Sequence, residues 1–318
     1  MKKHILGVVA FFALLATLVV PASRAQLCTY PTGSGSEPVD ILYEPNGNRV
    51  FVSVFALNEI LVLRNNCAFE TVFGTNGSNP RGLAFDGTNL WIALYGSNAV
   101  EKLNVSSGVV SVFSVGTQPY GVAFDGTYIW VTNSGSNNVT KLVASTGVLV
   151  ATIPVGSFPF GVAVNSTNNL TTVWVANRNS ASITILDQNG FLFNTISTGA
   201  EPQFFALNPY VETGITTGDM WVSCYSSQIV EQFSSTGGLL ASYAVTGHGQ
   251  PLGLSIENRA PYAVSGVTHN GTVFSINTAN HTVLYTGPVG SNNYGFAYAP
   301  VSNSFWGTDI NQGLIFEY

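Results

Sequence analysis

Residues 119–137, PYGVAFDGTYIWVTNSGSN, determine the architecture of the whole chain. Two short β-rich runs lie on either side of Asp125-Gly126, a dipeptide typical of tight hairpin turns. Two more β-rich runs follow, over residues 139–143 and 148–155, with a turn-like Ala-Ser-Thr-Gly sequence between them. The stretch therefore predicts a meander of four short antiparallel strands, and one such meander cannot bury both of its faces alone.

The same meander recurs along the chain with a period of about 42 residues. An opening residue marks the first strand of every unit: Pro38, Pro80, Pro119, Pro159, Pro202, Pro251 and Asn293. An aromatic residue marks every second strand, and these positions include all five tryptophans: Phe51, Trp91, Trp130, Trp174, Trp221, Tyr262 and Trp306. Four strands per unit at this period predict an all-β fold, a seven-bladed β-propeller of four-stranded antiparallel blades.

The seventh unit is incomplete. It holds three predicted strands, at residues 294–298, 304–308 and 313–318. Residues 26–37 precede the first opening proline and belong to no unit. We expect this N-terminal segment to supply the missing outer strand of the last blade, because that pairing would close the ring and cover an open strand edge.

The N-terminus has the features of a signal peptide. A basic Met1-Lys2-Lys3 start leads into an apolar run over residues 5–20, and Ser23-Arg24-Ala25 supplies the small residues that a signal peptidase reads. The run is shorter than the roughly 20 residues of a spanning helix, although a retained membrane anchor is the alternative. We expect residues 1–25 to be a signal peptide and residues 26–318 a single propeller, secreted or periplasmic/extracellular, with no membrane insertion after cleavage.

Charge argues against nucleic acid as a partner. Without the leader, 7 basic side chains remain against 16 acidic ones, a net charge of −9. A chain without a basic patch or stripe suits neither nucleic acid nor an anionic membrane surface. Charged residues make up only 8% of the sequence, so hydroxyls and amides must form the polar surface, as suits an extracellular β-protein.

The chain has three cysteines, Cys28, Cys67 and Cys224. In an oxidising compartment we expect Cys28 and Cys67 to pair, because both lie in turn-like sequence near the ring closure. Cys224 falls in a predicted second strand, where a buried free thiol is expected. Lipidation of Cys28 is the less favoured alternative, because Leu27 stands where a small residue is needed. No spacing resembles a zinc or haem motif, and we expect no metal and no cofactor.

The run from Pro119 to Phe124, followed by Trp130-Val131-Thr132-Asn133, resembles the YVTN-type propeller repeat of secreted and surface proteins. It is also similar to the repeat of the streptogramin (virginiamycin B) lyase propellers, and the resemblance covers nearly all of residues 38–318. The lyase resemblance implies a histidine directly after an opening proline and a glutamate three residues after the landmark aromatic. With a nearby histidine, these would hold a magnesium ion and act on substrate.

This chain departs from the lyase pattern. The residues after the opening prolines include no histidine: Val39, Arg81, Tyr120, Phe160, Gln203 and Leu252. Of the seven residues three places after the landmark aromatics, only Asp309 is an acid. We therefore expect the fold of these propellers without their chemistry.

Propeller geometry predicts a candidate binding face. The connections between blades and the loops between second and third strands open on one face, which would gather nine residues that we predict to bind ligand: Arg81, Tyr95, Tyr120, Asn133, Phe160, Asn177, Arg178, Tyr225 and Tyr294. Rings and amides suit the binding of a glycan or peptide. We predict a monomeric, non-enzymatic binding module for a glycan, peptide or protein partner, and the alternative is that the rings only cover the blade tops.

A competing site on the same face comprises His248, His269 and Asp309, with Glu201 nearby. Two imidazoles and a carboxylate could hold a divalent metal or act as acid and base. The second hypothesis is therefore a divergent lyase-like or hydrolytic enzyme with a metal-assisted His/Asp site. Its alternative is that these are ordinary solvated loop histidines.

Overall fold

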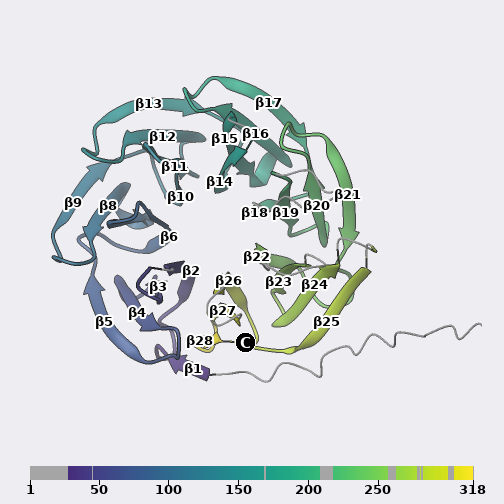
Figure 1. The fold of residues 1–318 in the computed structure, drawn as a ribbon, viewed down its shortest axis with the longest axis horizontal. Coiled ribbons are helices and arrows are strands. Elements are labelled where there is room, and N and C mark those ends of the chain that lie inside the picture. The colour runs from purple at the N-terminus through teal and green to yellow at the C-terminus, as the bar shows by residue number, and fades with distance from the viewer. Residues whose placement is uncertain are drawn as a thin grey trace, which may run out of the picture.

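The computed structural model describes residues 28–44, 46–167, 170–207, 218–256, 263–277, 280, 282–299 and 304–317. They form seven four-stranded antiparallel sheets arranged as blades around a common axis (Figure 1). The predicted all-β, seven-bladed propeller is thereby confirmed. The proposed leader and the landmark Tyr262 lie outside the described residues. Within the described part of the chain, no helix is both long and apolar enough to cross a membrane.

In each blade the strand nearest the axis comes first in the unit, and the following strands lie progressively outward (Figure 1). The innermost strands are β2 (Pro38–Glu44), β6 (Pro80–Phe85), β10 (Pro119–Phe124), β14 (Pro159–Thr167), β18 (Pro202–Leu207), β22 (Pro251–Ile256) and β26 (Asn293–Ala299). The second strands are β3 (Arg49–Val54), β7 (Asn89–Leu94), β11 (Tyr128–Asn133), β15 (Leu170–Asn177), β19 (Met220–Cys224), β23 (Ala263–Thr268) and β27 (Ser304–Asp309).

The two outer strands of each blade complete the sheet. The third strands are β4 (Glu59–Arg64), β8 (Ala99–Asn104), β12 (Asn138–Val143), β16 (Ser182–Asp187), β20 (Ile229–Phe233), β24 (Thr272–Asn277) and β28 (Leu314–Glu317). The outermost strands are β5 (Phe69–Gly74), β9 (Val110–Ser114), β13 (Leu149–Pro154), β17 (Leu192–Ser197), β21 (Leu239–Ala244), β25 (Thr282–Pro288) and β1 (Cys28–Pro31). Two short 3₁₀ turns, η1 (Tyr95–Ser97) and η2 (Arg178–Ser180), follow β7 and β15.

The core lies in layers between neighbouring blades, and the tryptophans fill it. All five are at most 1% exposed. Trp91, for example, packs with Val122 and Ile129 of the next blade. Its indole Nε1 donates a hydrogen bond of 2.9 Å to Asp86, which belongs to the Asp-Gly turn of its own blade. Trp130 makes the equivalent bond to Asp125, at 2.8 Å, so in these two blades the Asp-Gly turn also holds the tryptophan.

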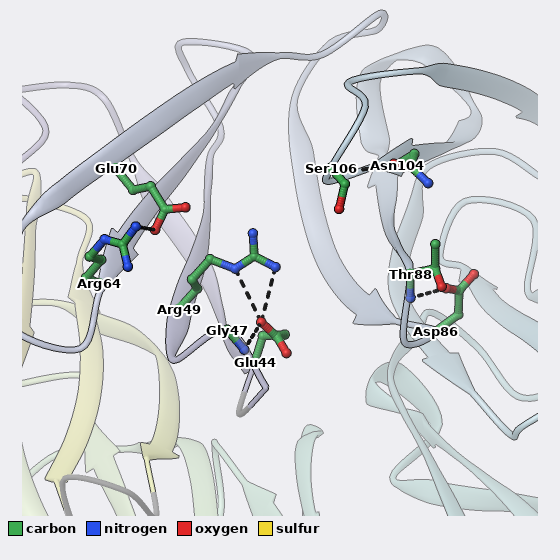
Figure 2. Close-up of polar contacts among 9 residues, drawn as sticks. All are labelled: Glu44, Gly47, Arg49, Arg64, Glu70, Asp86, Thr88, Asn104 and Ser106. Atoms are coloured by element: carbon green, nitrogen blue, oxygen red, sulfur yellow. Dashed lines mark hydrogen bonds and ion pairs between the residues drawn. The ribbon is translucent and has the colours of Figure 1, made fainter.

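The turns between first and second strands lie on the face opposite the blade connections, and local polar contacts hold them (Figure 2). Asp86 Oδ1 accepts a hydrogen bond of 3.0 Å from the Thr88 N–H. In the first blade, Glu44 Oε2 accepts one of 2.8 Å from the Gly47 N–H and pairs with Arg49 at 3.2 Å. Both carboxylates are therefore hydrogen-bonded within their own turns.

The N-terminal strand closes the ring, as expected. Strand β1 pairs antiparallel with β28, with Cys28 opposite Glu317, and gives the last blade its fourth strand (Figure 1). Cys28 forms the expected disulfide with Cys67, which lies after β4 of the first blade. The disulfide thus ties the strand that completes the last blade to the first blade. Cys224 is buried and free, also as expected.

Candidate functional site

The opening residues and the ends of the second strands meet on one face of the ring. Pro159 lies opposite Asn177, and the N–H of the next residue, Arg178, donates a hydrogen bond of 3.0 Å to the Phe158 carbonyl. The same pairing of backbone groups recurs one blade on, where the Tyr225 N–H donates to the Glu201 carbonyl. This face therefore brings together the side chains that follow each opening residue and each second strand.

Four rings from four inner strands meet at the axis, and we call them the aromatic layer: Tyr120, Phe160, Phe204 and Tyr294. The centroids of Tyr120 and Phe160 are 3.8 Å apart. Phe204 meets both Phe160 and Tyr294 edge to face, at 5.4 and 5.5 Å. The Tyr120 and Tyr294 hydroxyls are hydrogen-bonded to each other. Burial raises the pKa of both phenols, so both are neutral at physiological pH.

Arg81 is held beside this layer by aromatic rings. Its guanidinium carbon lies 4.5, 4.7 and 4.6 Å from the ring centroids of Phe55, Tyr95 and Tyr120. Its Nη1 donates a hydrogen bond of 2.8 Å to the Tyr120 hydroxyl. The predicted residues Arg81, Tyr95 and Tyr120 are thus brought together, with the cation enclosed by the rings.

A pocket of about 220 Å³ lies on this face, and we call it the face pocket. It is lined by Phe160, Arg178, Gln203, Tyr225, Leu252, His269, Asn292, Tyr294 and Ile310. Tyr225 and His269 meet edge to face at 6.0 Å. Arg178 pairs with Glu201 at 3.3 Å and lies 5.8 Å from the Phe160 ring centroid. Four of the nine residues predicted to bind ligand therefore line a single pocket.

The side chains of Asn133 and Asn177 do not reach the surface of this face and lie outside the face pocket. Both side chains are 0% exposed. Asn133 Nδ2 donates hydrogen bonds to Asn138 Oδ1 and Thr140 Oγ1, at 2.8 and 2.9 Å. Asn177 makes the equivalent bond to Thr184 in its own blade. These amides fix the junction of second and third strands, which explains why they recur.

The alternative site of His248, His269 and Asp309 is not assembled. Asp309 is 0% exposed, and its Oδ2 accepts a hydrogen bond of 2.7 Å from the Ser291 N–H. His248 is exposed and stacks at 3.8 Å on Tyr285 of the outermost strand β25. Of these three, only His269 lines the face pocket. The three side chains therefore do not line a common pocket in this structure.

Metal-ligating residue types also come together at the ring closure, within the described part of the chain. There, the one group of three His, Cys, Asp or Glu residues with ligand atoms within 4.8 Å of one another is Cys28, Cys67 and Glu317. Its two cysteines form the disulfide.

The sequence analysis did not identify Asp40 and Phe204 as site residues, although both lie at the ring centre. Both occupy the third position of the opening motif, Pro-x-Gly, which is glycine in five units: Gly82, Gly121, Gly161, Gly253 and Gly295. Their departure from glycine at this position was the sequence signal that could have identified them. Both residues line a cavity whose lining also includes Tyr120 and Tyr294 of the aromatic layer.

Comparison with known proteins supports the fold. No family model and no curated protein matches this chain. A streptogramin B lyase structure matches with a TM-score of 0.76 and 18% identity, covering 91% of this chain and 96% of that one. Virginiamycin B lyase from Staphylococcus aureus and Kuenenia stuttgartiensis hydrazine synthase each match with a TM-score of 0.76 and 13% identity, covering 91% of this chain and 97% of theirs. Such identities establish a shared propeller fold, as the resemblance to the lyase-like repeat implied, and leave the function open.

Proposed function

We propose that this protein is a secreted, non-enzymatic binding module that holds a glycan, peptide or protein partner through the face pocket. The observation that carries this proposal is the composition of that pocket. Rings of Phe160, Tyr225 and Tyr294 supply rigid apolar surface, while Gln203 and Asn292 supply amides that can both donate and accept hydrogen bonds. A few polar groups among aromatic walls are typical of ligand sites.

The size of the face pocket and the charge of its lining determine which ligands it can bind. A volume of about 220 Å³ lies below the range of about 300–1,000 Å³ that holds a drug-sized ligand. It therefore accepts one sugar ring or one side chain, with the remainder of the partner lying across the face. None of its nine lining residues is a carboxylate, so it offers recognition rather than a carboxylate acid–base pair.

Two further observations support export and the absence of nucleic acid. The Cys28–Cys67 disulfide fits an oxidising compartment, in agreement with the predicted signal peptide. The net charge of −9 expected for the mature chain opposes binding to polyanions.

Glycan and peptide arrays probed with the mature protein test this proposal. Hits are then measured by calorimetry with Tyr225→Ala and His269→Ala, both at half-buried pocket positions. Truncating a tyrosine at the centre of a contact costs more than about 1.4 kcal/mol, so affinity should fall at least about tenfold. Tyr43→Ala, on the opposite face, is the matched control and should bind as the parent does. Equal binding by parent and pocket variants, or no hit on either array, would contradict the proposal.

A further inference from the structure

The inner strands approach one another so closely that glycine is needed at the third position of the opening motif. A Cβ on Gly121 would lie 2.7 Å from the Phe160 carbonyl oxygen of the next inner strand. A Cβ on Gly295 would lie 2.8 Å from the Val39 carbonyl oxygen, across the junction of the last and first blades. A side chain at this position is therefore an exception that the ring must accommodate in its centre.

Asp40 in β2 and Phe204 in β18 are those exceptions. Asp40 lies opposite Ser53 and directly before Ile41, which lies opposite Val52. In the next blade Leu83 lies opposite Ile92, so Gly82, directly before it, holds the place of Asp40. Both exceptional side chains line a cavity of about 160 Å³ around the axis, which we call the central cavity. Five blades thus have glycine at this position, and the other two have side chains whose residues line the cavity.

Asp40 carries a half-buried carboxyl group that belongs to none of the ion pairs among the described residues. Its oxygens accept hydrogen bonds from the N–H groups of Ile41 and Leu83, at 3.0 and 2.8 Å. The ion pairs found among the described residues are Glu44–Arg49, Arg64–Glu70 and Arg178–Glu201, so Asp40 belongs to none of them. Burial raises the pKa of Asp40 to about 6. A cation reaching this carboxylate would therefore be stabilised.

Arg81 lines the same cavity with unused donors. Its Nη1 bonds to the Tyr120 hydroxyl, but its Nε is buried with no hydrogen-bond partner. The surrounding rings fix the guanidinium, so little side-chain freedom is lost when it binds an anion.

The two charges act on one hydroxyl between them. Burial is the main cause that raises the pKa of Tyr294; Arg81 lowers it and Asp40 raises it. Tyr294 also lines the central cavity. The cavity therefore presents a cation, an anion and a phenol pair, and its other walls are glycine backbone, aliphatic and phenyl groups.

We propose that the central cavity binds a small zwitterion, of the class of the free α-amino acids, with its ammonium group at Asp40 and its carboxylate at Arg81. A ligand with one charge would leave the opposite protein charge unpaired in a site of low dielectric constant, so the two-charge ligand is preferred. A cavity of about 150 Å³ holds a benzene molecule, so this one accepts ligands of about six non-hydrogen atoms. This cavity shares the Tyr294 wall with the face pocket but is otherwise lined by different residues, so each proposal can fail without the other.

Calorimetry with glycine, L-alanine and L-serine on the mature protein tests the zwitterion site. At least one should bind with a Kd below about 1 mM. Propionate and ethylammonium each keep one charge of alanine, and each should bind at least about tenfold more weakly than the best amino acid.

The repeat supplies variants that the fold already accepts. Asp40→Gly installs the residue of five other blades, and Arg81→Gln installs the residue that follows Pro202. Each should weaken amino-acid binding at least about tenfold, and Glu59→Gln, which removes a carboxylate outside the cavity lining, should not. If one variant fails to fold, the other decides. No binding of any of the three amino acids at about 10 mM, equal binding of a one-charge analogue, or unchanged affinity in the folded variants would overturn the proposal.

Discussion

The disulfide at the ring closure allows a prediction with a defined magnitude. Replacing both partners, as Cys28→Ser with Cys67→Ser, releases a cross-link between residues 39 apart in sequence. The chain-entropy relation gives about 13 cal/mol/K for a loop of this length, or about 4 kcal/mol at 25 °C. The contacts of β1 with β28 remain available in the folded variant. The loss of stability therefore comes from the higher conformational entropy of the unfolded chain.

The same loss of unfolding free energy predicts a decrease in the melting temperature. Unfolding entropy is about 2.1 cal/mol/K per residue, or about 0.6 kcal/mol/K for a propeller of this length. A loss of about 4 kcal/mol should therefore lower the Tm by about 6 °C. Urea unfolding and scanning calorimetry of the mature protein would measure both quantities.

Reduction of the parent protein is the control for this experiment. A reductant should bring the parent to the Tm of the double variant and should leave the variant unchanged. A loss below about 1 kcal/mol would refute the reasoning, because it would mean that the loop between Cys28 and Cys67 is already restricted in the unfolded chain.

Three further predictions follow from the described contacts. Deleting residues 26–36 should cost more stability than the double serine variant, since β28 then loses β1, its outer neighbour, as well as the cross-link; a smaller decrease in urea midpoint than that of the double serine variant would contradict the closure. Phe160→Ala should destabilise the fold by about 3–5 kcal/mol in urea, because the ring is 3% exposed, whereas Tyr225→Ala should cost much less; equal losses would show that Tyr225 is structural. The folded pKa of Asp40, about 6, exceeds its ordinary value of 3.8, so the folded state binds more protons between these values, and the stability that this group contributes falls by about 2 kcal/mol as pH rises from 4 to 6. The difference in unfolding free energy between parent and Asp40→Gly should carry that slope, and a difference independent of pH would refute it.

The fold was predictable because its signals repeat. An opening proline, an Asp-Gly turn and a strand tryptophan recur at one period, and each has a physical role that the structure shows, as in the Trp91 bond to Asp86. Ring closure followed from counting, since the last unit was one strand short and the N-terminal segment was one strand in excess.

The site was only partly predictable, because position on a face does not determine burial. In an exposed sheet, alternation along a strand separates buried from solvated side chains. Propeller blades are covered on both sides, so Thr132 and Asn133, which point to opposite sides of β11, are both 0% exposed. Topology therefore located Asn133 at the correct end of its strand, and only coordinates could show that its amide points into the blade. Asp40 was not predicted for a different reason: the site prediction used positions that follow the repeat, and Asp40 departs from it.

Because β1 pairs with β28, the last blade has four strands like the others, and the closure point is one blade among seven. Cys28 and Glu317 lie opposite each other in one blade, so a linker of a few residues would join these two positions. A circular permutant opened in another blade connection would then place its new termini between two intact blades. Such a protein would keep every blade contact described here and could carry a fused domain at whichever blade is opened.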